Sequence, residues 1–541
     1  MDLDEEDEDE DEASWGEEQE QDKLPTLTMP ILKKWQKALL EQRSLRALRR
    51  LLLAFRSAAY MHDDDQVTAW NIDNSAVYNK LLTTTFRYTP IVLEHHIPYK
   101  KLANGKFKPP TQTPKFKALQ KLILSYFQNA VHMMSQMTDN EMLRLAVSEC
   151  TKLIPYLTSS RKAIKHYLKK CLELWSSSPD DIRLAAFAAM RMLASSSDES
   201  MLDSVLRGTY LTILRSSKAT TPYTLPSINL MKNTASDVFC IDHSVAYQHA
   251  FGFIRQLAIQ LRNSMKIRAK ETYKEVHNWQ FVHSVDFWSM VLAKACHVQS
   301  PTEDSKQENE IKALIYPLVQ VCLGALRLVP SGRSYPFHLH VLRSLTHLIK
   351  HTHIYIPLSP YLMPIITSVF TSSSRPKSST LRPLDFEAHI HVPQQYAKTR
   401  ILNEGLLEEA MYLLAEWLST EAVQGSIAFP EMVIPIVVQL RRSLKDAKPV
   451  HGSIKNHGVV KNILERVEES ARWVESGRKN VTFAPGKMEA VAEWEKDLKS
   501  KVADSPLCKY VRVQRKVREK RHKLAEKARE GEGEVVESDS E

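Results

Sequence analysis

Residues 113–134, TPKFKALQKLILSYFQNAVHMM, decide the fold of this chain. Thr113 and Pro114 supply an N-cap and a first helical position. Apolar side chains then recur at alternating steps of three and four residues, at Phe116, Leu119, Ile123, Tyr126, Ala130 and Met133. This spacing lays one apolar stripe along an α-helix. It predicts an amphipathic helix that must pack against a neighbour to bury that stripe.

Similar segments follow at regular intervals. Helix starts are predicted near residues 114, 139, 160, 179 and 198, so a helical pair repeats about every 40 residues, the period of HEAT and armadillo units. The apolar pattern continues through 245–266, 274–298, 308–329, 336–353, 359–370, 397–419, 430–445, 456–477 and 487–500. Each pair in such a repeat buries its apolar face only by stacking on its neighbours. We predict an all-α, HEAT/armadillo-like helical repeat solenoid with disordered charged termini.

Composition agrees with a helical globular chain. Of 541 residues, 43% are hydrophobic and 25% are charged, and only 14 are glycines, which leaves little material for phosphate loops or β-turns. The charge-free run Ala313 to Leu326 is shorter than the roughly 18–20 residues that span a bilayer. The six cysteines form no CxxC pair, so neither a disulfide framework nor a cysteine zinc site is indicated. The acidic start does not resemble a secretory leader, and we expect a cytosolic or nuclear protein.

Shifts in composition predict seven segments. An acidic disordered segment covers 1–30, and an N-terminal helix (Ile31–Tyr60) with a docked extended segment covers 31–112. HEAT-like repeats cover 113–370. The remaining segments are a Ser/Pro-rich connection at 371–396, C-terminal solenoid helices at 397–445, polar helices with a docking arm at 446–508, and a basic then acidic tail at 509–541.

The net charge of +9 conceals strong segregation. Residues 1–22 carry 14 acidic and no basic side chains, and 530–541 carry six acidic and no basic ones, which leaves +29 on residues 23–529. A charge of this size attracts polyanions and gives salt-dependent affinity for nucleic acid. The alternative is a solvated surface that keeps the protein soluble.

The densest basic run is KYVRVQRKVREKRHKLAEKAR at 509–529, with ten basic and two acidic side chains. Few apolar residues interrupt it, so we predict that it is flexible or helical only on contact. It fits a nuclear import signal, an RNA-binding arm or a solvated tail. The candidate residues for RNA binding or nuclear import are Arg512, Arg515, Lys516, Arg518, Lys520, Arg521 and Lys523.

Motifs for catalysis do not occur. The chain has no GxxxxGK[ST], GxGxxG, GxSxG or HExxH. His347 and His351 have the helical spacing of a two-imidazole metal site but lack a third ligand nearby. Glu408 and Glu409 diverge by about 100° on a helix, so they cannot share a substrate. We predict a protein that is not an enzyme, with no catalytic residue, metal, cofactor, small-molecule substrate or membrane partner.

Two segments are candidates for partner binding. Within 246–266, Tyr247, Phe251, Ile254, Ala258 and Leu261 form an apolar stripe, beside which Gln248, Arg255 and Arg262 recur every seven residues. Arg255 and Arg262 are the candidate contacts, the alternative being a solvated or internally paired face. The second segment is RKNVTFAPGK at 478–487, an extended piece predicted to dock through Val481, Phe483 and Pro485.

Residues 278–295 carry a further aromatic pattern. Phe281, Val285, Trp288, Leu292 and Ala295 repeat at steps of four and three. Large aromatic side chains at helical spacing are usually interior, so we expect core packing here.

Several long segments carry a resemblance to a known family. They are FRYTPIVLEHHIPYK (86–100), YQHAFGFIRQLAIQLRN (247–263), VHNWQFVHSVDFWSMVL (276–292), IYPLVQVCLGALRLVPSGRSYPFHLHVLRSL (315–345) and WVESGRKNVTFAPG from Trp473. In this order they resemble the nucleolar complex protein 2 family over roughly residues 86–500. The resemblance implies a non-enzymatic ribosome-assembly factor of the nucleolus and nucleoplasm, active in rRNA processing and in maturation and intranuclear transport of the large ribosomal subunit. It also implies nucleolar complex protein 1-like and protein 3-like HEAT-repeat partners and pre-60S particles with rRNA.

Two other classes of function remain open. A chromatin-associated, histone-binding or transcriptional regulator adaptor is suggested by the acidic termini. A nuclear transport receptor is also built from HEAT units, but such chains are usually longer and acidic, and the net positive charge argues against it.

Overall fold

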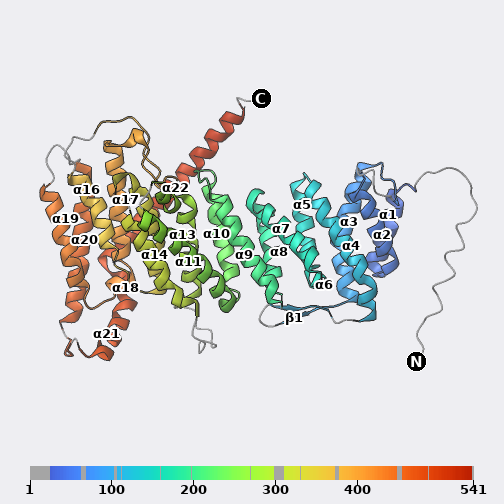
Figure 1. Cartoon of the computed structure of the whole chain (residues 1–541), viewed down its shortest axis with the longest axis horizontal. Coiled ribbons are helices and arrows are strands. Elements are labelled where there is room, and N and C mark those ends of the chain that lie inside the picture. Colours follow the sequence, from blue (N-terminus) through green and yellow to red (C-terminus); the bar gives the residue numbers. More distant parts are fainter. Residues whose placement is uncertain are drawn as a thin grey trace, which may run out of the picture. The chain divides into compact units, whose positions relative to one another are not determined.

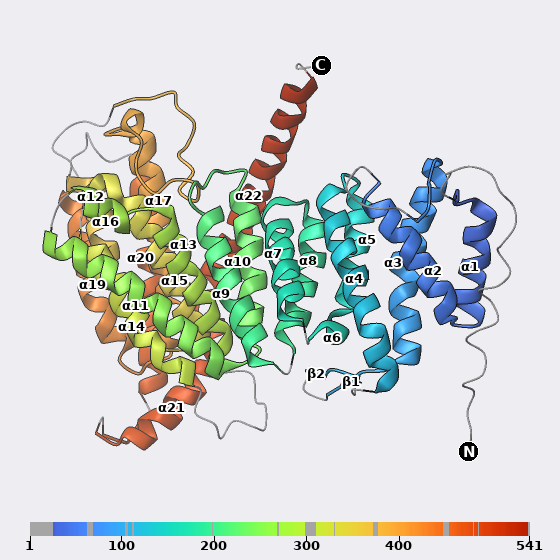
Figure 2. The same ribbon diagram turned by 45° about the vertical axis from the view of Figure 1, so that its right-hand side comes forward.

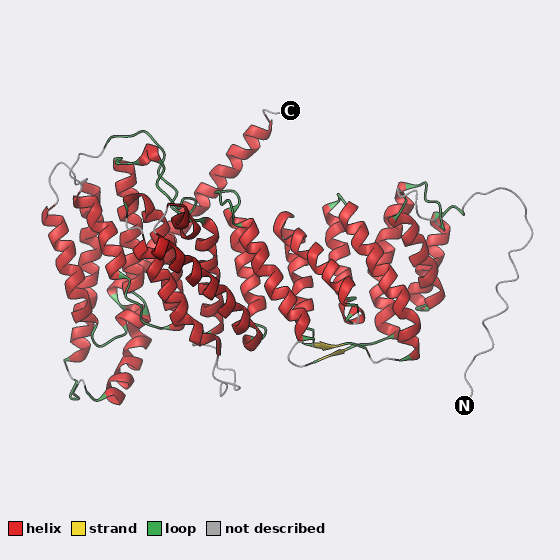
Figure 3. Cartoon of the chain, viewed as in Figure 1, coloured by secondary structure: helices red, strands yellow, loops and turns green. Residues whose placement is uncertain are grey.

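The computed structural model describes residues 25–61, 69–102, 106–110, 113–158, 160–196, 198–267, 270–297, 310–328, 331–371, 377–446, 454–479, 481–484 and 486–538. These residues form 22 α-helices, short 3₁₀ turns and one antiparallel two-stranded hairpin (Figures 1 and 3). The predicted all-α, helical repeat class is confirmed. The chain divides into two compact units, Met1–Asp198 and Glu199–Glu541, and the division falls inside the predicted 113–370 segment.

Unit 1 stacks its helices in two layers. Its elements are α1 (Met29–Glu41), α2 (Leu45–Ala59), α3 (Ser75–His96), β1 (Lys100–Lys101), β2 (Phe107–Lys108), α4 (Pro114–Gln136), α5 (Asn140–Thr151), α6 (Ile154–Leu157), α7 (Arg161–Ser177) and α8 (Asp180–Ala194). One layer runs α1, α3, α5, α8 and the other runs α2, α4, α7, each helix packing on the next of its layer. Such nearest-neighbour stacking characterises helical repeats.

The stripe on α4 is the core of unit 1. The Thr113 hydroxyl accepts the N–H of Phe116 as the predicted N-cap, and Pro114 opens the first turn. The predicted apolar positions of α4 are buried. Phe55 of α2 meets Phe86 of α3 and Tyr126 of α4 edge to face, with centroids 5.4 and 5.3 Å apart. Three helices therefore share one aromatic cluster.

The amino end differs from prediction in two ways. The single helix expected over Ile31–Tyr60 is two helices, because Arg43 takes a left-handed φ of 50° and Ser44 caps α2 by accepting the N–H of Ala47. Residues 25–28, predicted to be disordered, belong to the fold. Leu27 is buried, and its N–H donates to the Asn71 carbonyl at 2.9 Å. Residues 1–24 lie outside the described chain.

Most of the predicted extended segment is helical. Three consecutive threonines (Thr83–Thr85) and Pro90 weaken the helix propensity of α3, but its face bearing Leu81, Phe86 and Leu93 is buried. Burial of an amphipathic face outweighs propensity in a packed helix. In the described part of this segment, Asn71 forms a parallel bridge with Thr26, and the β1–β2 hairpin docks through the N–H of Phe107 on the Ser195 carbonyl at 3.2 Å.

Within unit 2 the helices also stack in layers (Figure 2). Its α-helices are α9 (Glu199–Ser216), α10 (Leu225–Phe239), α11 (His243–Ile267), α12 (Lys270–Val276), α13 (Trp279–Ala295), α14 (Ile315–Leu328), α15 (Tyr335–Thr352), α16 (Ser359–Thr371), α17 (Arg400–Leu418), α18 (Glu421–Gln424), α19 (Phe429–Asp446), α20 (Ile454–Arg478), α21 (Met488–Lys501) and α22 (Pro506–Ser538). Its 3₁₀ turns are η1 (Glu310–Leu314), η2 (Gly332–Ser334), η3 (Gln394–Tyr396) and η4 (Val502–Asp504). Helices α10, α13, α15, α17 and α20 pack in succession, while α9 packs on α11, α11 on α14 and α16 on α19.

The predicted core positions of α13 are confirmed. Phe281, Val285, Trp288 and Leu292 are all buried, and Ala295 is half-buried. Trp288 lies 5.1 Å from Tyr210 of α9 and 5.3 Å from Phe239 of α10, measured between ring centroids. Helix α13 thus joins α9 and α10 through one aromatic cluster.

The connection between α16 and α17 packs on the fold without forming an α-helix in its described part, 377–399. The N–H of Phe337 donates to the Ile390 carbonyl at 3.1 Å, and the N–H of Val392 donates to the Arg333 carbonyl at 2.9 Å. These bonds satisfy backbone groups at the start of α15.

A polar contact also crosses the core of unit 2. Lys232 of α10, with 5% of its side chain exposed, forms an ion pair with Asp286 of α13, and Ser344 of α15 donates to the second carboxylate oxygen at 2.9 Å. Burial by itself would raise the pKa of Asp286, but the charge of Lys232 and both hydrogen bonds lower it to about 2. Burial, then Lys232, lowers the pKa of the adjacent His283 to about 3, and this neutral ring bonds the Thr220 hydroxyl.

We expect Asp286→Ala to destabilise the full chain by about 2–3 kcal/mol, because it leaves the Lys232 ammonium buried without a counter-charge. The folded pKa of Asp286 is depressed, so its carboxylate contributes fully to the free energy of unfolding above the unfolded pKa of about 4. This contribution is lost as the pH falls toward 2. Urea midpoints followed by circular dichroism at pH 7 and pH 3 measure both effects. The control is Asp237→Ala, which removes the exposed pair with Lys294. Equal midpoints for the two variants at pH 7 would contradict the prediction.

Candidate interaction surfaces

An open apolar groove of about 640 Å³ lies between α11 and α14. Its apolar lining is Phe251, Ile254, Ala258, Leu261 and Met265 from α11, and Leu314, Tyr316, Pro317 and Val321 from η1 and α14. Phe251, Met265 and Tyr316 are 49%, 55% and 71% exposed. Large apolar side chains gathered in one open patch mark interaction sites.

The groove follows from the sequence of α14. Glu310–Leu328 is long and apolar enough to cross a membrane by length and composition alone, and half of its most apolar window is buried in the fold. One side of α14 packs on α11, α13 and α15, and Gly324 permits a close approach, since a Cβ there would lie 2.7 Å from Leu261 Cδ2. The remaining side of α14 exposes the aromatic ring of Tyr316 beside the polar Gln320 and Arg327, and an exposed apolar ring is stabilised by cover from another surface. The wall that α14 gives to the groove is the side without such cover.

Arg255 and Arg262, predicted from sequence as partner contacts, line this groove with Lys266. Positions 251, 255, 258, 262 and 265 alternate by four and three, so both arginines share the ridge of α11 that carries Phe251 and Met265. All three cations are exposed, and within the described chain none of them forms an ion pair. The predicted stripe is divided: Ile254 and Leu261 are buried, whereas Phe251 stays open.

The predicted docking arm is a loop between α20 and α21. Val481 and Phe483 are half-buried there, and Pro485 lies outside the described residues. Arg478 anchors the start of the loop with two bonds to the Glu431 carboxylate, at 2.9 and 3.1 Å, and one to the Ile427 carbonyl at 3.0 Å. The bond from Arg478 lowers the pKa of Glu431. No sequence pattern indicates Arg478, because its partners lie on α19 and on the residues before it.

The basic run 509–529, predicted to be flexible or helical only on contact, is part of helix α22, which packs on α17 and α20 and reaches Ser538 in the predicted disordered tail. Its first turns are fixed by Leu507 and Val511, both buried. The N–H of Leu507 donates to Ser470 of α20, and the N–H of Cys508 donates to the Ser505 hydroxyl, at 3.0 and 3.2 Å. These contacts give α22 the packing that its charged composition did not predict.

Arg518 joins α22 to α17 and, through the shared Glu409 carboxylate, to α15. Its guanidinium lies 4.0 Å from the ring centroid of Tyr412 and donates to Glu409 of α17 at 2.5 Å. The other oxygen of Glu409 accepts from Arg343 of α15 at 2.7 Å. Burial alone would raise the pKa of the Glu409 carboxyl, but the charges of Arg343 and Arg518 lower it. Charge-assisted bonds and cation–π stacking therefore act on one guanidinium.

Two further arginines complete this contact. Arg515 pairs with Glu416 at 2.7 Å and Arg521 with Glu408 at 2.8 Å. Three of the seven residues predicted to bind RNA or an import factor thus pair within the fold. Lys516, Lys520 and Lys523 are exposed and form no ion pair with another described residue. Arg512 is also exposed, and it donates to the Ala503 carbonyl at 3.3 Å.

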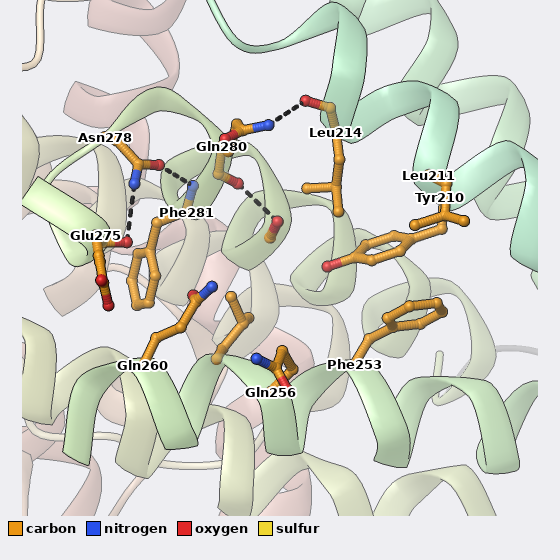
Figure 4. A pocket seen from close by; sticks show the side chains of 12 residues that line it. Tyr210, Leu211, Leu214, Phe253, Gln256, Gln260, Glu275, Asn278, Gln280 and Phe281 are labelled. Atoms are coloured by element: carbon orange, nitrogen blue, oxygen red, sulfur yellow. Dashed lines mark hydrogen bonds between the residues drawn. The ribbon is translucent and has the colours of Figure 1, made fainter. Parts of the chain in front are cut away.

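A second, smaller cavity of about 240 Å³ lies among α9, α11 and α13. Figure 4 shows Tyr210 and Phe253 on one side of it and Gln256 and Gln260 along α11. Gln280 donates to the Leu214 carbonyl at 2.7 Å, which ties α13 to α9. Its volume is below the roughly 300–1,000 Å³ of most small-molecule pockets. We interpret this cavity as a packing space between helices.

Metal and thiol chemistry find little support in the described residues, which contain no group of three or more His, Cys, Asp or Glu side chains placed to hold a metal ion. The rings of His347 and His351 lie 4.5 Å apart, and burial lowers the pKa of His351 to about 4. Burial also raises the pKa of the Cys171 thiol to about 12. A buried, protonated thiol is chemically inert.

Comparison with known proteins identifies the family. The sequence model of the Noc2p family matches residues 200–514. An uncharacterized NOC2 family protein of Schizosaccharomyces pombe is 33% identical over 92% of this chain and 69% of its own length. Nucleolar complex protein 2 of Drosophila melanogaster is 27% identical over 88% of this chain, and nucleolar complex-associated protein 2 of Arabidopsis thaliana is 26% identical over 92%. The chain spans 61% and 63% of these two relatives.

Among solved structures, a circular tandem repeat protein aligns with 82% of this chain and 89% of its own, at 12% identity and a TM-score of 0.20. That score is too low to bear on the fold, which rests on the helices described above. Both the family match and the 33% identical relative cover the groove between α11 and α14. This chain belongs to the Noc2p family.

Proposed function

We propose that the chain is a non-enzymatic scaffold of ribosome biogenesis in the nucleolus and nucleoplasm. In this proposal it binds nucleolar complex protein 1-like and protein 3-like HEAT-repeat proteins and accompanies pre-60S particles, with their rRNA, through maturation and intranuclear transport. Family membership and the names of the relatives support the nucleolar setting. The observation that carries the scaffold role is the open groove between α11 and α14 with its exposed cationic edge. The chromatin alternative rests on acidic termini, of which residues 1–24 are not described.

The groove suits a helix of a partner solenoid. Two helices form its walls, which is the arrangement that receives an amphipathic helix with apolar anchors at i, i+3/4 and i+7. Phe251 and Tyr316 offer exposed aromatic surface, the type of side chain that supplies most binding energy at interfaces. Arg255, Arg262 and Lys266 select a helix that carries carboxylates beside its apolar ridge. A HEAT-repeat protein has such amphipathic helices in quantity.

We expect Phe251→Glu with Tyr316→Glu to lower co-purification of the related HEAT-repeat proteins at least tenfold, because two carboxylates would be buried against apolar surface. Both side chains are already exposed, so the chain should keep its melting temperature. The measurement is quantitative mass spectrometry of tagged full-length protein purified from cells.

The matched control is Tyr223→Glu with Tyr355→Glu, two aromatic residues outside the groove lining that are 70% and 47% exposed. Like the groove variant, this control adds two carboxylates, and it places them at side chains with nearly the same exposed fractions. Recovery of the partners at equal levels with both double variants would refute the role of the groove. Enrichment of histones in place of ribosomal precursors would refute the scaffold role and favour the chromatin alternative.

For nuclear import we expect Lys516→Ala, Lys520→Ala and Lys523→Ala together to reduce nuclear accumulation several-fold. These lysines carry charge without holding α22 in place, so the effect reports on recognition of a basic cluster. Quantitative imaging of the tagged chain gives the nuclear to cytoplasmic ratio. Lys218→Ala, Lys312→Ala and Lys461→Ala remove the same charge from scattered exposed sites. An unchanged ratio in the α22 variant would show that its lysines are not the import signal.

A further inference from the structure

One layer of unit 1 carries a strong excess of positive charge. Helices α2, α4 and α7 contain a single acidic residue, Glu173, which pairs with Lys170 of the same helix. Their basic residues are Arg46, Arg49, Arg50, Arg56, Lys115, Lys117, Lys121, Arg161, Lys162, Lys165, Lys169 and Lys170. The other layer, α1, α3, α5 and α8, carries eight basic and six acidic residues. Charge is therefore segregated between the two layers.

These cations lie on one continuous surface. Helix α4 packs on α2 on one side and on α7 on the other, and Figures 1 and 2 show it between them. The apolar faces of the three helices are buried inside the unit. The charged positions are consequently outward, and Arg49, Arg50, Lys115, Lys117, Lys121, Arg161, Lys162, Lys165 and Lys169 are all exposed. Neighbouring helix axes lie about 8–10 Å apart, so the rows of charge run side by side.

The β1–β2 hairpin extends this surface. No acidic residue occurs between Glu94 and Asp139, a stretch that includes the hairpin and the whole of α4. Lys100, Lys101 and Lys108 are exposed on the hairpin. Acidic residues flank these helices in sequence, at Glu41 and 63–65 around α2 and at Asp139 and Glu141 after α4. Within the three helices and the hairpin, Glu173 is the single acidic residue.

We propose that this basic surface of α2, α4, α7 and the hairpin binds RNA through its phosphate backbone. A contiguous array of Lys and Arg releases condensed counterions from RNA and gives salt-dependent affinity. Every aromatic residue of the three helices is buried, so no stacking platform for unpaired bases is offered. The surface contacts phosphates and leaves base sequence unread.

The surface fits RNA better than an acidic protein. Protein interfaces depend on apolar or aromatic anchors, and Leu53 is the one large apolar side chain that these three helices expose strongly. The choice of RNA as the polyanion rests on the proposed function in ribosome biogenesis. The groove between α11 and α14 is formed by other helices, so the two can be tested separately.

The test compares two charge-reversed forms of the full chain. One reverses the basic surface, with Lys115→Glu, Lys117→Glu, Lys162→Glu and Lys165→Glu. The matched control reverses four exposed cations on α3, α5 and α8, with Lys80→Glu, Arg87→Glu, Arg144→Glu and Arg191→Glu. Both change the net charge equally. Fluorescence anisotropy with a labelled RNA hairpin, over a range of KCl concentrations, gives affinity and its salt dependence.

We expect the surface variant to bind at least tenfold more weakly, with the slope of log K against log salt reduced by about 3, as for four lost phosphate contacts. The control should stay within about twofold of the unchanged chain at matched salt. If both variants lose RNA affinity equally, the loss is due to net charge alone and the proposal is overturned. Unchanged RNA affinity of the surface variant would also overturn it.

A further arm addresses an acidic protein ligand. If the surface variant keeps its RNA affinity but loses binding to a synthetic peptide of residues 1–22, the surface serves acidic protein and the RNA assignment is wrong. The groove variant Phe251→Glu with Tyr316→Glu should retain full RNA affinity. If the groove variant loses its protein partners but keeps its RNA affinity, the two surfaces act independently. Failure of the groove proposal can then be distinguished from failure of the RNA proposal.

Discussion

The structure depends on one constraint, which is that no helix of this chain can bury its apolar face alone. Helix α4 places its stripe against α2 and α3 through the cluster of Phe55, Phe86 and Tyr126, and α13 does the same against α9 and α10 through Trp288. Each helix therefore depends on the next, as in other helical repeats. Where the stacking leaves an apolar face open, as along α14, the same constraint creates a surface that favours a partner.

Ion pairs have a different role in each part of unit 2. Lys232 is buried and Asp286 is half-buried, so loss of the carboxylate would leave the Lys232 ammonium buried without a counter-charge. Arg518, Arg515 and Arg521 lie nearer the surface and hold α22 on α17 through Glu409, Glu416 and Glu408. The stacking of Arg518 on Tyr412 adds a contact that does not depend on a carboxylate. A helix with the composition of a solvated tail thereby becomes part of the fold.

The two units present different surface chemistry. The groove of unit 2 is apolar with a cationic edge, which suits the ridge of a helix. The basic surface of unit 1 is almost free of exposed apolar side chains, which suits a polyanion. The two surfaces are formed by different helices. Neither surface requires a catalytic group, and the chemistry of the described residues gives no reason to assign one.

The sequence by itself determined the helical class and the positions of most helices from 113 onward, because the three-and-four spacing of apolar residues is a local property of the chain. It also picked out Arg255 and Arg262, whose seven-residue spacing is visible in one helix. Only the tertiary structure decided that α14 supplies the second wall of their groove and that Arg518 is paired. The partner of Arg518 lies 109 residues upstream, and no periodicity links them. Similarly, α2, α4 and α7 form one basic surface only because alternate helices stack in the same layer. Local spacing fixes which face of a helix is apolar, whereas packing over long sequence separation fixes which charged faces meet and which remain exposed.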